Sequence, residues 1–242
     1  MTVVGFDTAT ADTAVCAMRA GEVLYEERLG LAPDGSPRHS TALLAEVERA
    51  ADAAGGWSAV ERIAVGLGPG SFVGIRIGLA TARGLAASTG LPVDGVCTLD
   101  ALARAMTELV APARAEGQPG KDCLAVLDAR RGEIFAALYA ASGERLWEPL
   151  VAAPGDLVER LGELSMPPMA AGSGAVRFRD ELASRGVAVP DDADPVHRVA
   201  ARHVCALAAA TADRGGDSLE PIYLRPPDAQ RWRERDTPTR SD

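Results

Sequence analysis

Lysine is almost absent from this sequence, and aromatic residues are scarce. Lys121 is the only lysine in 242 residues, aromatic side chains make up 4% of the chain, and the formal net charge is −9. A protein that binds nucleic acid on its own needs a clustered basic surface to neutralise backbone phosphates. The composition therefore argues against a free-standing nucleic-acid binder, and we expect any RNA contact to use a partner's charges.

Paired cysteines, a basic leader and long apolar runs are also missing. The four cysteines are widely separated, lie in apolar surroundings and form no C-x-x-C pair, so we expect reduced core residues rather than disulfides or metal ligands. The first residues, MTVVGFDTATADTAV, contain no basic leader, and the most apolar helical stretch carries Arg76 and Arg83. We therefore expect neither a signal peptide nor a transmembrane span, and a cytoplasmic location.

What the chain does contain is one order of elements that occurs twice. The first series has predicted strands at 3–6, 13–19, 23–29, 63–67 and 93–97, with helices from about 38 to 54, 71 to 88 and 99 to 115. After the breaker-rich linker AEGQPG, the second has strands at 123–127, 134–139, 145–150 and 169–171, a helix near 154–164 and a Gly loop at 172–174. VVGFDTAT resembles LAVLDARR, which favours two related α/β domains over a chance similarity between the two segments.

The predicted domain boundaries follow from the linker. Residues 1–115 form the first α/β domain, completed by a long helix near 195–214 that Asp194-Pro195 would cap. Residues 121–194 form the second domain. The polar tail 226–242 lacks periodicity and is predicted to be disordered.

The stretch GLGPGSFVGIRIGLATARGLA, residues 66–86, supports two hypotheses. In the first, glycines between a strand and a helix expose N–H groups to a nucleotide phosphate, and an aspartate ending a first strand orients magnesium. The loop has no Gly-Lys-Ser/Thr and no G-x-G-x-x-G pattern, so the match is weak. The candidate nucleotide-binding residues are Asp7, Thr8, Thr10, Gly68, Gly70 and Asp128.

In the second hypothesis the same stretch forms a close helix contact. Small residues recur every four positions, at Gly70, Gly74, Gly78, Ala82 and Ala86, and form one strip along the helix. Glycine inside a helix costs about 1 kcal/mol relative to alanine, so the strip needs a compensating close approach. The neighbour is either part of the same domain or another chain, and a second apolar stripe at 43–47 favours another chain. We then expect Gly74→Leu or Gly78→Leu to abolish association and leave the monomer folded.

Histidine is too sparse to suggest a catalytic or metal site. His39 is the only histidine of the first half and is followed four positions later by Leu43, so an H-x-x-x-H metal pair is absent. His197 and His203 are six positions apart and would lie on different helix faces. We assemble no Ser/His/Asp or Cys/His set and assign no catalytic or metal-binding residue.

These motifs together resemble the bacterial TsaB family, also called YeaZ-like and, in older usage, M22 glycoprotease-like. The resemblance rests on VVGFDTAT, RHSTALL, the 66–86 stretch, LDARRGEIFAALY and PIYLR, in the family order. It implies an actin/Hsp70/sugar-kinase-like fold of two related α/β domains. Family members resemble the catalytic subunit TsaD without its metal-binding histidine pair, which agrees with Leu43 following His39.

The resemblance also implies a role. The chain would be a non-catalytic partner that binds and activates TsaD for threonylcarbamoyl transfer to adenosine 37 of tRNAs reading codons that begin with A. It implies a homodimer when the chain is alone, a TsaE-like ATPase in the complex, tRNA contact only through the complex, and no membrane. The implied partner-interface residues are His39, Ser40, Leu43, Leu44, Val47, Gly70, Ser71, Phe72, Gly74, Ile75, Gly78, Leu79, Ala82 and Arg83.

Two questions stay open at this point. No cofactor is expected for the isolated chain, but ATP or ADP with magnesium at the complex interface is left open. The rival function is a nucleotide-hydrolysing or phosphoryl-transferring enzyme that uses Asp7 and the Gly66–Ser71 loop. A third candidate function is proteolysis, for which the sequence shows no set of peptidase residues.

Overall fold

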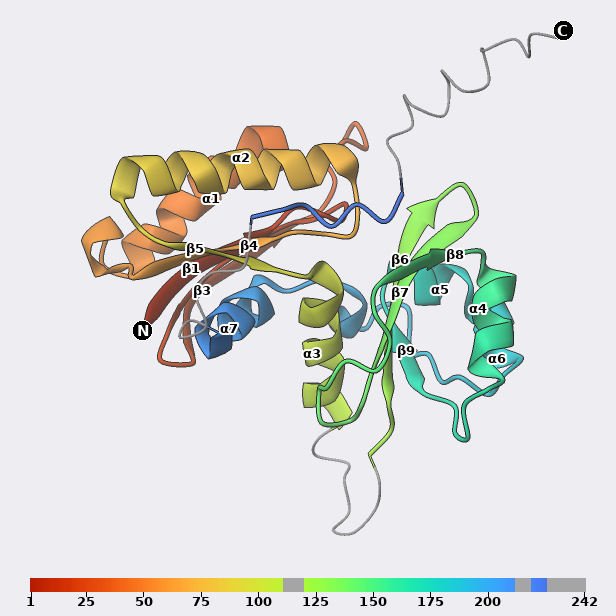
Figure 1. The fold of residues 1–242 in the computed structure, drawn as a ribbon. Helices are drawn as coiled ribbons and strands as arrows, with labels where there is room; N and C mark the ends of the chain where they lie inside the picture. Colours follow the sequence, from red (N-terminus) through yellow and green to blue (C-terminus); the bar gives the residue numbers. More distant parts are fainter. Residues whose placement is uncertain (111–119, 212–218, 226–242) are drawn as a thin grey trace, which may run out of the picture.

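The computed structural model describes residues 1–110, 120–211 and 219–225 and arranges their strands in two mixed sheets (Figure 1). The strand order is β3-β2-β1-β4-β5 in the first sheet and β8-β7-β6-β9 in the second. The strands are β1 (Thr2–Asp7), β2 (Thr13–Arg19), β3 (Glu22–Leu29), β4 (Arg62–Gly66), β5 (Val93–Val96), β6 (Cys123–Arg130), β7 (Glu133–Tyr139), β8 (Leu150–Ala152) and β9 (Met169–Ala171).

The first sheet is covered by helices on both faces. Helices α1 (His39–Ala53) and α2 (Phe72–Thr89) lie on one face, and α7 (Ala201–Thr211) packs on the other (Figure 1). Strand β1 is buried throughout because its side chains alternate between these two layers: Val4 faces α1 and α2, and Val3 faces α7. A Cβ at Gly5 would stand 2.6 Å from Cys205 Sγ, so this glycine lets α7 lie close to β1.

The second sheet is also covered on both faces. The short helices α4 (Pro154–Leu161), α5 (Ser173–Arg177) and α6 (Arg179–Ala183) pack against one face, where Leu124 and Ile134 are buried. Helix α3 (Thr98–Val110) packs against the other, where Leu127 and Phe135 are buried. Three-residue 3-10 turns at Trp57–Ala59 and Pro195–His197 complete the elements of the described residues.

Both halves share one strand arrangement. The first strand of each series pairs antiparallel with the second and parallel with the fourth. The third strand pairs antiparallel with the second. The first half adds β5 at its edge. This repetition confirms the prediction of two related α/β units.

Helices α3 and α7 form the layer between the sheets. Although α3 follows the first series in sequence, it contacts β6, while α7 at the end of the second series contacts β1 and β2 (Figure 1). At the outer edge of this layer Asp100 of α3 accepts hydrogen bonds from Tyr139 Oη at 2.6 Å and Arg145 Nη2 at 2.7 Å. The domain boundaries given above stay a prediction, because the last helix of each half packs on the sheet of the other.

His203 lies buried between α7 and α3 without a full set of partners. Its Nδ1 is 3.6 Å from Glu108 Oε1, and its Nε2 is buried with no hydrogen-bond partner among the described residues. Burial, with Arg202 and Arg104 nearby, lowers the pKa of His203 from 6.5 to about 4. The folded protein therefore resists protonating this ring.

This histidine makes an acid-dependent loss of stability predictable. Between about pH 6.5 and 4 the unfolded chain binds a proton at this site that the folded chain does not, so stability falls as pH falls. At about 1.4 kcal/mol per pKa unit, the contribution amounts to about 3 kcal/mol. Urea unfolding at pH 7 and pH 4 should show His203→Gln losing about 2–3 kcal/mol less than the unsubstituted protein. Equal losses in both proteins would contradict this, since other titrating groups are common to both.

Two sequence predictions of secondary structure are wrong. The strand expected at 145–150 is a loop with one isolated bridge, Tyr139 to Arg145, and the strand β8 begins only at Leu150. The helix expected from about 195 begins at Ala201. The Asp194 side chain does act as a cap, accepting from Val196 N at 2.9 Å, but the turn it caps ends at His197.

Three further expectations concern the cysteines, a membrane span, and the linker and tail. The four cysteines are buried and free, which confirms the prediction of unpaired core residues. Burial also raises the pKa of Cys97 to about 12 and of Cys123 to about 11. No helix within the described ranges is long and apolar enough to cross a membrane. The linker, except for Gly120, and the tail 226–242 lie outside the described residues.

Candidate functional site

The loop before α2 uses its amide groups within the chain. Leu67 N donates to Val96 O at 2.8 Å, Gly68 N to Thr98 Oγ1 at 3.2 Å, and Ser71 N to Ala9 O at 2.7 Å. Ser71 then caps α2, because its Oγ accepts from Gly74 N at 3.2 Å. These three donors are not free to hold an anion, which weakens the phosphate hypothesis.

The small-residue strip of α2 faces the interior of its own chain. A Cβ would stand 2.1 Å from Ala9 O at Gly70, 2.0 Å from Thr8 O at Gly74 and 2.5 Å from Thr8 Oγ1 at Gly78. The strip therefore lets α2 lie directly on the β1–β2 connection, where Thr8 Oγ1 donates to Gly74 O at 2.8 Å. The interpretation that the strip faces another protein is therefore wrong. The same distances lead us to expect that Gly74→Leu or Gly78→Leu would disturb the fold of the monomer.

A different face of the same two helices is exposed and apolar. On α1 the Leu44 side chain is 57% exposed, and on α2 Val73 is 65% exposed. Ala80 and Gly84 are also exposed and Ile77 is half-buried, so α2 presents positions 73, 77, 80 and 84 along one line. We call Leu44 together with these four positions the outer face.

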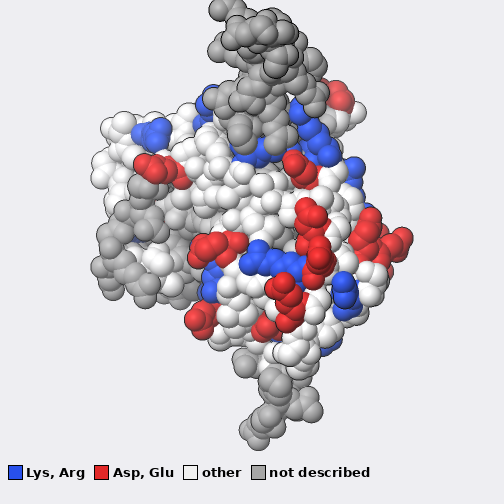
Figure 2. Space-filling model, turned by 45° about the vertical axis from the view of Figure 1, so that its right-hand side comes forward, with Lys and Arg blue, Asp and Glu red and all other residues white. Residues whose placement is uncertain are grey.

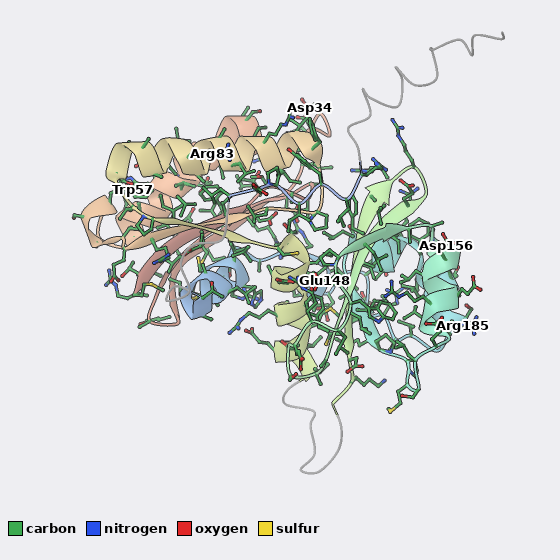
Figure 3. The ribbon with its side chains drawn as sticks, viewed as in Figure 1. Asp34, Trp57, Arg83, Glu148, Asp156 and Arg185 are labelled. Carbon is green, nitrogen blue, oxygen red and sulfur yellow. The ribbon has the colours of Figure 1, made fainter. Side chains whose placement is uncertain are left out.

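The predicted interface residues therefore divide by exposure. Exposed are Ser40, Leu44, Ser71 and Arg83; Gly70 and Phe72 are half-buried; and buried are His39, Leu43, Val47, Gly74, Ile75, Gly78, Leu79 and Ala82. Arg83 points from α2 toward the segment 219–225, where its Nη2 donates to Leu219 O at 2.9 Å (Figure 3). The interface assignment itself stays a prediction, and its buried members cannot meet a partner without a rearrangement.

His39 is held in place as a neutral structural residue. Its Nε2 is 3.2 Å from Thr10 O, which can only accept, so Nε2 carries the proton and Nδ1 accepts from Thr13 Oγ1 at 2.8 Å. Burial lowers the pKa of His39. The ring thus ties α1 to the β1–β2 connection, and the next position on its face is the buried Leu43.

The Asp7 side chain is likewise held by hydrogen bonds within the fold. Its Oδ1 accepts from Ala9 N at 2.8 Å and its Oδ2 from Thr98 Oγ1 at 2.7 Å, while a Cβ at Gly66 would stand 1.9 Å from Oδ2. Burial raises the pKa of Asp7 against these hydrogen bonds. The carboxylate fastens β1 to the start of α3 and does not reach an open surface.

A cleft of about 770 Å³ lies between the two halves. Its walls are the β1–β2 connection (Ala9–Asp12) and the start of α2 on one side, and the β6–β7 hairpin (Leu127–Arg130) with Ser173 on the other; His197–Val199 and the segment Ile222–Arg225 also line it. Both aspartates in the lining are paired: Asp12 with Arg198 at 2.6 Å, and Asp128 with Arg177 at 2.8 Å.

The predicted nucleotide-binding residues only partly meet in this cleft. Thr10, Gly70 and Asp128 line it, whereas Asp7, Thr8 and Gly68 are buried elsewhere and do not. The amides of this region are also used internally: Asp12 N donates to Thr10 Oγ1, Asp128 N to Ser173 Oγ, and Gly172 N to His197 Nδ1. A magnesium nucleotide held by Asp7 and loop amides therefore does not fit these residues. No group of three potential metal ligands occurs among the described residues.

Sequence reasoning did not place two parts of the cleft there, although PIYLR, residues 221–225, carries part of the family resemblance. The segment 219–225 crosses from the first half to the second: Ile222 N donates to Leu67 O at 2.8 Å, and Arg225 pairs with Glu133 at 2.7 Å. Tyr223 packs on Phe72 with ring centroids 5.0 Å apart. Arg198 and Arg130 were not singled out either, because nothing in their local pattern distinguishes them from surface arginines.

Two α/β units with one strand order, facing each other across a cleft, define the class that contains actin, Hsp70 and the sugar kinases. A family model described as "TsaD: tRNA N6-adenosine threonylcarbamoyltransferase" matches residues 22–212, and the chain belongs to this family, as a TsaB-like member.

The similar proteins agree along nearly the full length of the chain. An uncharacterized protein of Mycobacterium tuberculosis is 35% identical over 95% of this chain and 94% of its own length. The Escherichia coli "tRNA threonylcarbamoyladenosine biosynthesis protein TsaB" is 29% identical over 93% of this chain and 95% of its own. The solved structure of YeaZ from Pseudomonas aeruginosa superposes with a TM-score of 0.71 at 26% identity, covering 92% and 99% of the two chains.

Proposed function

We propose that this chain is a non-catalytic subunit of the machinery that makes threonylcarbamoyladenosine in tRNA, and that it acts in the cytoplasm. It binds and activates a TsaD-like catalytic subunit, which transfers the threonylcarbamoyl group to adenosine 37 of tRNAs reading codons that begin with A. A TsaE-like ATPase joins this complex, and two copies of the chain pair when the catalytic subunit is absent. The names of the Escherichia coli relative and of the matching family model support the pathway.

The outer face of α1 and α2 is the observation that carries this proposal. Leu44 and Val73 are among the large apolar side chains that the described residues leave exposed, and they belong to neighbouring helices on one face of the first sheet (Figure 1). Covering such side chains releases about 25 cal/mol per Å² of apolar surface removed from water. The small exposed positions Ala80 and Gly84 would let a partner helix approach α2 closely.

The charge distribution supports tRNA contact through the partner. On the face of the molecule that Figure 2 turns toward the reader, acidic side chains alternate with basic ones. The first turns of α4 and α6 contribute Asp156, Asp180 and Glu181 to the second half. The net charge of the chain, −9, opposes binding of a phosphate backbone, so we expect the catalytic subunit to supply the basic contacts.

Leu44→Glu should separate docking from folding. The side chain stands in solvent, and glutamate is a good helix former, so the fold should keep its stability within about 0.5 kcal/mol. A charge buried at an apolar contact costs several kcal/mol, so affinity for the TsaD-like subunit should fall at least about a hundredfold. Co-purification and a titration of the catalytic subunit would measure this.

Leu146→Glu is the matched control, since Leu146 is 47% exposed but lies in the second half. It should leave affinity unchanged. In a tRNA modification assay the catalytic subunit should be active with the unsubstituted chain or Leu146→Glu, and inactive with Leu44→Glu or with no added chain. Full activity without the chain would overturn the activating role, and equal binding by both variants would overturn the docking face.

A further inference from the structure

Helix α2 carries two cations and no carboxylate. Among its 18 residues the charged side chains are Arg76 and Arg83 alone, whereas the whole chain has 34 aspartates and glutamates against 25 lysines and arginines. Both arginines are exposed, and neither forms an ion pair with a described residue. Their positive charge is therefore not neutralised within the described part of the chain.

The two arginines form a line beside the outer face. Seven positions separate them, which is about two helical turns and about 10 Å along the axis, so they lie on nearly the same side of α2. Val73 and Ala80 of the outer face are exposed next to them. On the other flank α2 meets α1, where a Cβ at Gly74 would stand 3.4 Å from His39 Cδ2. The outer face thus lies between α1 and the arginines.

The last described segment of the chain holds both arginines in place. Arg83 Nη2 donates to Leu219 O at 2.9 Å, and Arg76 Nε donates to Tyr223 Oη at 3.3 Å. The Arg76 guanidinium also lies 3.7 Å from the centre of the Phe72 ring. A guanidinium has five N–H donors, so most of them stay available, and a side chain that is already ordered loses less entropy on binding.

The surroundings of the arginines favour a protein partner over RNA. The outer face beside them is apolar, with Leu44 57% and Val73 65% exposed, and such side chains are buried at protein interfaces rather than against phosphates. Two arginines are also few for RNA, and the exposed Glu220 lies beside Leu219. Protein carboxylates match the paired donors of a guanidinium.

A second copy of the chain matches these arginines less well than an acidic partner does. In a two-fold contact the same surface patch of each copy meets itself. A contact of this kind through α2 would bring Arg76 and Arg83 toward the arginines of the other copy, with no carboxylate on either α2 to neutralise them. Like charges that face each other at an interface lower its affinity.

We propose that the TsaD-like catalytic subunit docks on α2 through an acidic segment, which places two carboxylates about 10 Å apart against Arg76 and Arg83. This inference rests on the proposed docking role and identifies the chemistry that selects the catalytic subunit over a second copy. The apolar outer face supplies most of the affinity. The arginines supply the selection and a faster association.

The double variant Arg76→Gln with Arg83→Gln tests this pairing. The catalytic subunit is titrated against the full chain at about 50 and about 500 mM NaCl, because salt screens exposed ion pairs. The unsubstituted chain should bind at least about tenfold more weakly at the higher salt concentration. The variant should bind at least about tenfold more weakly at the lower one and change less than about threefold between the two.

Arg160→Gln with Arg185→Gln is the matched control. It makes the same change in net charge with two exposed arginines of the second half, and Figure 3 shows Arg185 well separated from Arg83. Its affinity should equal that of the unsubstituted chain at both salt concentrations. Arg76→Lys with Arg83→Lys keeps both charges and should keep the salt dependence, which a merely structural role of the arginines would not explain.

Leu44→Glu separates this inference from the docking role. Equal binding by Leu44→Glu and the unsubstituted chain would overturn both. Loss of binding in Leu44→Glu, with the Arg76→Gln, Arg83→Gln variant binding like the control, would overturn the arginine pairing alone. So would a variant that keeps its affinity for the catalytic subunit but loses self-association or tRNA binding by the isolated chain, since the arginines would then serve a second copy or RNA.

Discussion

Gly74→Ala should strongly destabilise the protein, although alanine is the better helix former. The substitution gains about 1 kcal/mol of helix propensity. It also places a Cβ 2.0 Å from Thr8 O, a backbone atom that is fixed by the β1–β2 connection and cannot turn aside. Moving α2 away would break the hydrogen bond from Thr8 Oγ1 to Gly74 O and disturb the packing of His39 beside Gly74. We expect a net loss of about 2–4 kcal/mol, out of a typical total of 5–15.

Gly84→Ala on the same helix provides the matched control. Gly84 is exposed, and a Cβ there meets no atom within 4 Å, so the change should stabilise the protein by about 0.5–1 kcal/mol. Urea unfolding of both variants measures the difference. If Gly74→Ala proved as stable as Gly84→Ala, α2 would not lie on the β1–β2 connection as described.

Local signals were enough to predict most of the first half. Val3–Phe6, Thr13–Arg19 and the 71–88 helix were placed within one or two residues, because strand alternation, turn glycines and the Ser71 cap act over a few positions. The helix from 195 and the strand from 145 failed for the same reason. Asp194 has the pattern of a helix cap whether the helix that follows has three residues or twenty. Arg145 lies outside a strand and donates hydrogen bonds to Asp100, a partner 45 positions away that a local pattern cannot reveal.

The spacing of small residues in α2 predicted a close contact and could not identify the neighbour. Four-residue spacing places Gly70, Gly74 and Gly78 on one face of the helix, but the identity of the partner depends on the path of the whole chain. Here that face meets Thr8 and Ala9, some 60 positions earlier. The outer face was harder to see, since Val73, Ile77 and Ala80 are ordinary residues in an apolar helix and only their exposure sets them apart.

The cleft was the least predictable part. Its arginines come from the hairpin, from the turn before α7 and from the segment 219–225, and no local pattern in the sequence links these three places. The sequence does not indicate the left-handed backbone at Arg130 either. The two-residue turn that follows is Arg131-Gly132, whereas Asn-Gly is the preferred pair and would have given a clearer hairpin signal.

Arg62→Met should destabilise the protein by about 3–5 kcal/mol. Arg62 and Asp94 stand on the neighbouring parallel strands β4 and β5, and Arg62 Nη1 is 2.8 Å from both carboxylate oxygens. Their side chains are only 17% and 5% exposed. Removing the arginine therefore leaves Asp94 as a buried charge without its partner, and methionine, which replaces only the apolar stem, cannot compensate for that.

The pair also allows a double-mutant cycle. Asp94→Val alone should cost less than Arg62→Met, because the arginine can extend to water from its more exposed position. The double variant Arg62→Met with Asp94→Val removes both charges and should lie within about 1.5 kcal/mol of the unsubstituted protein. Additive losses in the double variant would show that packing around β4 and β5, rather than an uncompensated carboxylate, is what the single substitutions disturb.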